Sequence, residues 1–295
     1  MKRQFSLLIA IALVTLTASA QLLWKVSGNN LGRPSYIMGT YHFAPSTMMD
    51  KIPGMQRALE GCDIVVGEIA QESLAEPESQ LKMAQALMAH PDSTLDKLYT
   101  REEYRIIETV FNKYFGSMGV KLSQMNSVKP MAIITQMQAM QALKYFPNYD
   151  PAELIDMAVQ KRGLEMGRPS QGLETIEDQV DLLFNTPISE QATSLLELCK
   201  TDDKFLMLSS ALVEAYMEQD LDKIYAVMTN PEIGGDDPEA YEALLFDRNR
   251  LWVERLVKMM PERACLVCVG AGHLPGNQGL LQLLRDRGYT IEAMQ

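Results

Sequence analysis

Two of the three histidines in this 295-residue chain follow the same short pattern. His42 ends the segment Gly39-Thr40-Tyr41-His42, His273 ends Gly270-Ala271-Gly272-His273, and each segment follows an apolar run of strand length. Neutral imidazole nitrogens and carboxylate oxygens suit Zn, Mn, Co or Fe(II). If the two segments meet, they could hold a divalent metal ion that activates a water molecule. The alternative is that each histidine is an ordinary turn residue.

Two glutamates also stand where predicted strands end. Glu68 lies near the end of the apolar run 63–69, and Glu174 follows a strand predicted within 164–173. Ligands of α/β proteins bind outside the carboxyl ends of strands, so these carboxylates could join the two histidines. Glu68 could then be a metal ligand or a general base. The alternatives are a simple ion pair for Glu68 and, for Glu174, a favourable position before a helix N-terminus.

Arg248 lies in an apolar stripe of the last long predicted helix. The stripe has helical spacing and consists of Tyr241, Leu245, Arg248, Trp252, Leu256 and Met259. A buried guanidinium must be paired, so we expect a carboxylate of the site or a substrate carbonyl or carboxylate to contact it. Asn249 is one position further on and could join it. Alternatively, the Arg248 side chain reaches solvent or bridges two helices.

The elements that must position these residues are strands near both ends of the chain and helices between them. The strands are predicted at 22–27, 35–38, 63–69, within 164–173, at 265–269 and at 289–294. This order indicates an α/β fold in which a mixed central sheet, built from both chain ends, carries a large helical insertion at about 72–163. We find no internal repeat beyond the histidine pattern and predict a single domain over 21–295.

Residues 1–20 have the features of a secretory signal peptide: a basic start, an apolar stretch and a small-residue cleavage site at Ala18-Ser19-Ala20. No later stretch is apolar enough to span a bilayer. We therefore expect an exported protein, periplasmic or extracellular, without a membrane span after cleavage. The net charge of −11 argues against nucleic acid and anionic membranes as partners.

The remaining candidates for chemistry favour structural roles. Cys62, Cys199, Cys265 and Cys268 lie in apolar surroundings, which favours buried thiols and leaves disulfide pairing open. Cys265 and Cys268 are three residues apart on a predicted strand and would point to opposite faces, which disfavours a metal or redox pair. His90 is expected to be an exposed residue before a turn. The sequence has no nucleophile elbow, phosphate loop or dinucleotide fingerprint.

In their order along the chain, these motifs resemble the TraB/GumN family, relatives of the PrgY pheromone-shutdown proteins and the animal Tiki metalloproteases. The matching segments are 36–42, 65–68, 91–95, 172–175 with Gln179, Arg248-Asn249, and 270–274 with Gly276 and Gly279. Together they cover nearly the whole chain after the predicted signal peptide. Gly67 departs from the pattern, because the family often has a larger apolar residue there.

The resemblance implies the erythromycin-esterase/ChaN-like fold and a site built from paired Gly-x-x-His motifs, a glutamate and an Arg/Asn pair. In Tiki proteins that site is linked to divalent-metal-dependent cleavage of peptides. Carried over by motif, the metal or catalytic set is His42, Glu68 and His273. Glu174, Arg248 and Asn249 would support it, with Arg248 and Asn249 in the catalytic machinery and Glu174 and Arg248 binding substrate.

We therefore expect an exported metal-dependent hydrolase, a peptidase acting on a peptide or protein substrate with Mn, Co or Zn. A metal-bound water would attack the amide carbonyl, and Arg248 would stabilise the developing oxyanion. Two alternatives remain open. The first is a non-catalytic protein that binds and sequesters a peptide or signal. The second is a haem- or iron-binding protein, as in ChaN-like relatives.

Overall fold

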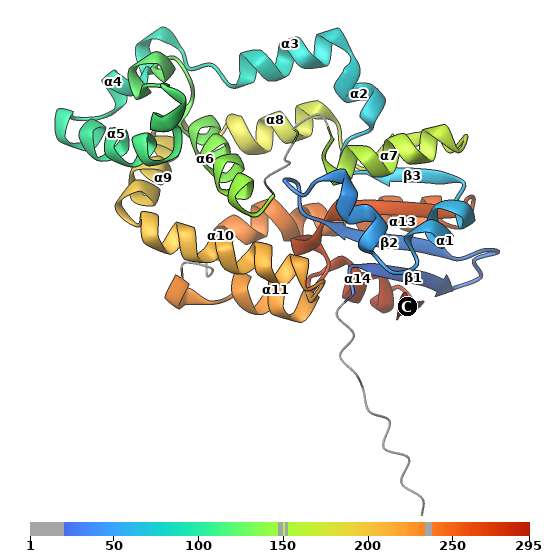
Figure 1. Ribbon diagram of the computed structural model, residues 1–295. Helices are drawn as coiled ribbons and strands as arrows, with labels where there is room; N and C mark the ends of the chain where they lie inside the picture. The colour runs from blue at the N-terminus through green and yellow to red at the C-terminus, as the bar shows by residue number, and fades with distance from the viewer. Residues whose placement is uncertain (1–20, 147–149, 151–152, 234–237) are drawn as a thin grey trace, which may run out of the picture.

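A computed structural model describes residues 21–146, 150, 153–233 and 238–295 (Figure 1). The predicted signal peptide at 1–20 lies outside the described residues. The described strands are β1 Leu23–Gly28, β2 Ser35–Thr40, β3 Ile64–Gly67, β4 Ser170–Gly172, β5 Cys265–Gly270 and β6 Tyr289–Ala293. They form a 6-stranded sheet in the order β4-β3-β5-β2-β1-β6. The predicted mixed sheet from both chain ends is confirmed.

The four strands β4, β3, β5 and β2 are mutually parallel, whereas β1 is antiparallel to both β2 and β6. Every residue of β2, β3 and β5 is buried. Parallel strands covered by helices on both faces have such continuous apolar sequences. Because the four strands are parallel, their carboxyl ends lie along the same edge of the sheet, where segments distant in sequence can meet.

Helices make up most of the remaining chain. The α-helices are α1 Met55–Gly61, α2 Gln71–Ala75, α3 Pro77–Ala86, α4 Leu95–Leu98, α5 Arg101–Phe115, α6 Pro130–Tyr145, α7 Ile155–Glu165, α8 Ile176–Phe184, α9 Ile188–Lys200, α10 Asp202–Met217, α11 Leu221–Met228, α12 Pro238–Tyr241, α13 Asp247–Met259 and α14 Leu280–Asp286. A π-helix, η6, spans Glu242–Phe246. The 3-10 turns are η1 Ser46–Lys51, η2 Pro91–Ser93, η3 Gly116–Met118, η4 Leu122–Met125, η5 Pro231–Ile233 and η7 Ala271–His273.

Among the described residues, two large hydrophobic cores and a small third cluster around Ile69, Ile176 and Val180 hold these helices. The larger core surrounds the sheet, and the fully buried Trp252 of α13 belongs to it. A second core joins α4, α5 and α6 to α9, with Phe111 and Leu195 among its buried members. Helices α2 to α7 occupy the predicted insertion, but α9 follows β4 and still shares the second core. The helical part, on the left in Figure 1, is therefore assembled from two separate stretches of sequence.

Helix α7 ends the predicted insertion and lies directly on the sheet. It packs on β3, where Gly163 lies so close to Val65 that an added Cβ would come within 2.4 Å of a Val65 methyl carbon. Glycine at 163 therefore permits the close approach. Because α7 is held tightly here, the first turn of α7 lies beside the carboxyl ends of the strands.

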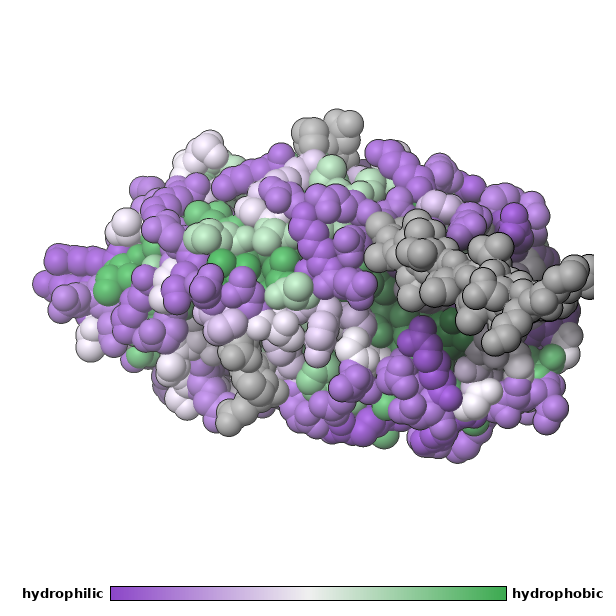
Figure 2. All heavy atoms as spheres, turned by 90° about the horizontal axis from the view of Figure 1, so that it is seen from below, coloured by the Kyte–Doolittle hydropathy of each residue, from purple (hydrophilic) through white to green (hydrophobic). Residues whose placement is uncertain are grey.

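The lower face of the molecule, seen in Figure 2, is mostly hydrophilic with an apolar area left of centre. Helix α10 lies on this lower side in Figure 1, and its Met207 is 57% exposed. Among the described residues, no helix has both the length and the apolar character needed to cross a membrane.

The remaining residues singled out in the sequence have structural surroundings. Cys62, Cys199, Cys265 and Cys268 are all buried and unpaired. His90 is exposed and its ring nitrogen Nδ1 accepts a hydrogen bond from the backbone N–H of Asp92 at 3.2 Å, at the start of η2. The predicted strand within 164–173 is reduced to the three residues of β4, because 164 and 165 still belong to α7.

Candidate functional site

The strand-end cluster, defined as His42, Glu68, Glu174 and His273, lies along one edge of the sheet. Glu174 follows β4, Glu68 follows β3, His273 ends η7 directly after β5, and His42 follows β2. These are the four neighbouring parallel strands, in that spatial order. Strand pairing places Thr40 of β2 opposite Gly270 of β5. The topology therefore brings the two Gly-x-x-His segments together, as the sequence pattern predicted.

The Glu68 carboxylate is the centre of the cluster. Its Oε1 accepts a hydrogen bond from the backbone N–H of Gly270 at 2.8 Å and lies 3.7 Å from His42 Nε2 and 3.8 Å from His273 Nε2. Its Oε2 pairs with Arg248 Nη2 at 2.6 Å and accepts from Gln179 Nε2 at 3.3 Å. One carboxylate oxygen thus faces both imidazoles, and the other is held by a guanidinium and an amide.

The Glu68 backbone is fixed by a buried glutamine of α7. Gln160 donates to the carbonyl of Ile69 at 3.1 Å, and its Oε1 accepts from the backbone N–H of Gln71 at 2.9 Å. A Cβ on Gly67 would lie only 2.5 Å from Gln160 Nε2. Gly67, which departs from the family pattern, therefore leaves space for the Gln160 side chain, which holds the backbone at the end of β3 by hydrogen bonds.

His42 is positioned by a residue that the sequence did not indicate. Its Nδ1 lies 3.3 Å from Asp156 Oδ2, and the other Asp156 oxygen accepts from the Thr40 hydroxyl at 2.5 Å. Asp156 is in the first turn of α7. A carboxylate on one ring nitrogen fixes the orientation of the other, which here faces Glu68. The His42 side chain is 56% exposed and forms the open side of the cluster.

His273 is enclosed, and its neighbours define its proton positions. Its Nδ1 lies 2.7 Å from Asn249 Oδ1, while Asn249 Nδ2 donates to the carbonyls of His273 and Gln278 at 3.1 and 2.8 Å. The amide nitrogen is committed to two carbonyls, so Asn249 Oδ1 is an acceptor and His273 Nδ1 must carry the proton. Nε2 is then left with a lone pair directed into the cluster.

Asn249 thus differs from its predicted catalytic role. It is fully buried, and its contacts are with the backbone and the Nδ1 side of His273, away from Glu68. It acts through His273 as a positioning residue. The Trp252 ring, 4.4 Å from the His273 ring between centroids, holds the imidazole from another side.

Arg248 is paired with carboxylates, as the apolar stripe predicted. Its Nε donates to Glu174 Oε1 at 2.8 Å and its Nη2 to Glu174 Oε2 at 2.9 Å, a two-pronged pairing. Its Nη1 donates to the carbonyl of Leu244 at 2.9 Å and lies 3.2 Å from His273 Nε2. The guanidinium also lies over the Trp252 ring, 4.5 Å from its centroid.

The electrostatics of the cluster separate the two histidines. Burial disfavours the carboxylate form of Glu68, but His42, His273, Arg248 and the Gly270 amide outweigh it and lower its pKa to about 2. Burial lowers the pKa of His273 to about 3, since the nearby Arg248 adds to the effect and Glu68 only partly opposes it. Desolvation also acts against a charged His42, but Asp156 and Glu68 raise its pKa to about 9. Solvent at the exposed ring partly screens these charges.

The predicted metal ligands fit a divalent cation in their chemistry. Gly270 has no side chain, and a Cβ there would lie 3.2 Å from His42 Nε2 and 3.5 Å from Glu68 Oε1. The two imidazole nitrogens and the carboxylate oxygen therefore surround a space that any larger residue would fill, and this donor set suits Zn, Mn or Co. Within the described residues, however, no group of three or more His, Cys, Asp or Glu side chains has the geometry to hold a metal ion. Arg248 Nη1 lies 3.2 Å from His273 Nε2, one of the predicted ligand atoms.

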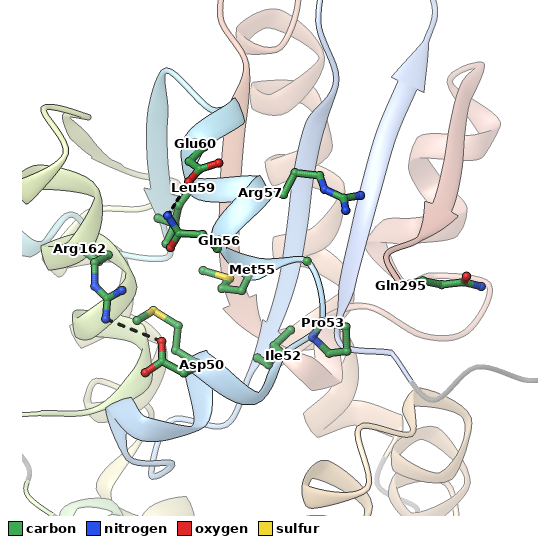
Figure 3. Close-up of a pocket in the computed structure, with 12 residues that line it drawn as sticks. Asp50, Ile52, Pro53, Met55, Gln56, Arg57, Leu59, Glu60, Arg162 and Gln295 are labelled. Atoms are coloured by element: carbon green, nitrogen blue, oxygen red, sulfur yellow. Dashed lines mark hydrogen bonds and ion pairs between the residues drawn. The ribbon is translucent and has the colours of Figure 1, made fainter.

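A well-defined cavity lies elsewhere. It has a volume of about 540 Å³ and is lined by residues of η1, α1 and α7, among them Asp50, Gln56 and Arg162 (Figure 3). The Asp50–Arg162 ion pair at 3.8 Å lies at one side of this cavity. No member of the strand-end cluster lines it. The chemistry of the cluster therefore decides where the candidate site is, rather than cavity size.

The class of protein follows from the sheet and the cluster: an α/β protein whose polar residues meet at the carboxyl ends of its parallel strands. A model of the TraB/PrgY/gumN family matches residues 22–293, and the chain belongs to that family. No curated protein matches the chain significantly. No solved structure does either.

Proposed function

We propose that this protein is an exported, divalent-metal-dependent hydrolase that cleaves a peptide or protein substrate. The observation that carries the proposal is the convergence of His42 Nε2 and His273 Nε2 on Glu68 Oε1, at 3.7 and 3.8 Å. Membership of the TraB/PrgY/gumN family supports it, because the resemblance to Tiki proteins implies peptide cleavage at this set of residues.

In this proposal His42, Glu68 and His273 hold the metal ion, which would be Mn, Co or Zn. The bound ion would lower the pKa of a water molecule and polarise the scissile carbonyl. Asp156 and Asn249 each occupy the Nδ1 side of a histidine and leave Nε2 directed inwards. Such outer contacts are the usual means of orienting metal-binding histidines.

We assign Glu68 as a ligand rather than as the general base. Its pKa of about 2 makes it a weak base, and its Oε1 already faces both imidazoles. Arg248 supplies N–H donors next to this oxygen and stabilises the oxyanion that forms on the substrate. Glu174 holds Arg248 in place. Substrate approaches past His42, because His42 is exposed whereas His273 is only 3% exposed.

The test is peptide cleavage by the purified protein with Mn, Co or Zn, compared with cleavage after chelation. His42→Ala and His273→Ala should abolish cleavage. His90→Ala is the matched control, because His90 is exposed and far along the chain from the cluster, and it should retain full activity. Unchanged cleavage by both the His42→Ala and His273→Ala variants rules out this mechanism.

A specific observation also supports the alternative of a non-catalytic binding protein. Arg248 pairs with both Glu68 and Glu174, so a side-chain cation already partners the carboxylates of the cluster without a metal ion. Such a protein would bind a peptide or signal and release it uncut. Recovery of a tight complex with intact peptide, from a preparation without metal by elemental analysis, would favour this alternative over hydrolysis.

A further inference from the structure

Arg248 contacts two of the three predicted metal ligands directly. Its Nη2 donates to Glu68 Oε2 at 2.6 Å, and its Nη1 lies 3.2 Å from His273 Nε2. In addition, Glu174 accepts from both Nε and Nη2. The guanidinium therefore occupies the position of a cation within the cluster.

The contact with His273 uses the only free lone pair of that ring. Nδ1 carries the proton, because Asn249 Oδ1 lies against it as an acceptor at 2.7 Å. Nε2 therefore has a single lone pair, which can accept a hydrogen bond from Arg248 or bind a metal ion. It cannot do both at once. Repulsion between the guanidinium and a dication adds to this exclusion.

We infer that Arg248 acts as a built-in cation that blocks the site, so that a divalent metal ion binds His273 only when the Nη1 end of Arg248 has moved away. The inference rests on the proposed function, because it concerns regulation of the same metal site. A simple oxyanion donor would offer Nη1 to the substrate at all times. In this inference, Nη1 is available as a hydrogen-bond donor only when metal is bound.

The guanidinium is planar and rigid, so Nη1 leaves His273 only when the whole group moves. Glu174 holds Arg248 through Nε and Nη2, and this pairing must shift as well. The other partner of Nη1 is the carbonyl of Leu244, which belongs to the π-helix Glu242–Phe246. Leu244 is 36% exposed, so this contact lies at the surface, although the neighbouring Leu245 packs against the larger core. Once the guanidinium has moved, Nη1 can donate to another acceptor.

The experiment compares metal binding by the full chain and three variants, measured by calorimetric titration with Mn²⁺ or Zn²⁺ alone. Arg248→Met removes the guanidinium. Arg248→Lys keeps a positive charge but lacks the planar fork that can pair with Glu174 and contact His273 together. Arg250→Met is the matched control, because Arg250 is on the same helix but exposed and paired with Glu242 and Asp247. Folding of each variant is checked by tryptophan fluorescence.

We expect Arg248→Met and Arg248→Lys to bind metal about tenfold or more tightly than the unmodified chain, since each loses a charge-assisted competitor. Arg250→Met should bind like the unmodified chain. Methylguanidinium added to Arg248→Met should weaken metal binding again in a saturable manner, whereas the unmodified chain should not respond. If Arg248 had only a structural role, added methylguanidinium would not weaken metal binding by Arg248→Met.

Equal or weaker metal binding by Arg248→Met would overturn the inference while leaving the proposed function intact. Tighter binding by Arg248→Met but not by Arg248→Lys would also overturn it, because the positive charge at this position, rather than the contact of Nη1 with His273 Nε2, would then exclude the metal ion. If neither the unmodified chain nor any variant binds metal, the proposed function fails and the inference fails with it. Tighter binding by both Arg248 variants supports the inference whether or not the protein cleaves peptides.

Discussion

Glu174 is the residue whose loss should most weaken the candidate site. Its side chain is 8% exposed and accepts from Arg248 Nε and Nη2 and from the indole N–H of Trp252, at 2.8, 2.9 and 2.9 Å. Glu174→Gln keeps the shape but turns one acceptor into a donor that faces another donor. Glu174→Ala removes both acceptors. Either change leaves a buried guanidinium and a buried indole N–H short of partners.

Breaking a buried ion pair by removing one partner destabilises a protein by about 3–5 kcal/mol. Arg248 retains Glu68 at 2.6 Å, so we expect the lower part of that range. For a chain of this size about 3 kcal/mol corresponds to a fall in Tm of roughly 5 °C. Glu174→Gln should be nearly as destabilising as Glu174→Ala, because charge and acceptor number matter here more than volume.

The measurement is equilibrium denaturation in urea, followed by tryptophan fluorescence, with Trp252 as a reporter next to the substituted residue. Glu177→Gln is the control. It lies in the first turn of α8, is 57% exposed and pairs with Lys82, so its loss should change stability by less than about 1 kcal/mol. If both Glu174 variants lose less than about 1 kcal/mol, Glu174 does not hold Arg248 as we describe.

Two further predictions concern the site as a whole. In chelator, the Tm should be highest near pH 6.5. The lowered pKa of His273, about 3, gives stability that is lost as pH falls below 6.5, and the lowered pKa of Glu68, about 2, gives stability that is lost as pH falls below 4.5. The raised pKa of His42, about 9, gives stability that is lost as pH rises above 6.5. A Tm that is flat between pH 4 and 9 would contradict these charge states. Gly270→Ala should shift Tm by only a few degrees, because the exposed His42 ring can move aside. The same substitution should weaken Mn²⁺ binding about tenfold or more, because the added methyl group fills the space between His42 and Glu68. Tight binding by a folded Gly270→Ala protein would show that the metal lies elsewhere.

The strand-end residues could be predicted because a parallel sheet makes local sequence informative about distant contacts. An apolar run followed by a polar residue places that residue at the carboxyl edge, whichever strand it comes from. His42, Glu68, Glu174 and His273 all satisfied this rule. Arg248 was predicted by a different argument, since a charge in an apolar helical stripe requires a buried partner.

Asp156 could not be predicted in this way. Its sequence position suggests only an acid within a helix, a common and usually solvated location. Its contact with His42 depends on how α7 crosses the sheet, which is set by the close approach of Gly163 to Val65 and by the hydrogen bonds of Gln160. The role of Asn249 was missed for a similar reason. Its side chain is one step around α13 from Arg248, and only the tertiary structure shows that it contacts the Nδ1 side of His273.

The sheet and the helices contribute different kinds of residue to the site. The sheet edge supplies the groups that could bind a metal ion, whereas the helices supply the groups that orient or oppose them: Asp156 from α7, and Arg248 and Asn249 from α13. Sheet-edge positions are fixed by strand register, so they change little without unfolding. Helix α13 is preceded by a π-helix in which no residue is fully buried, so the start of α13 can adjust more easily. Any control over the cluster should therefore act through Arg248 rather than through the histidines, and substitutions in Glu242–Phe246 should change metal affinity while leaving the sheet intact.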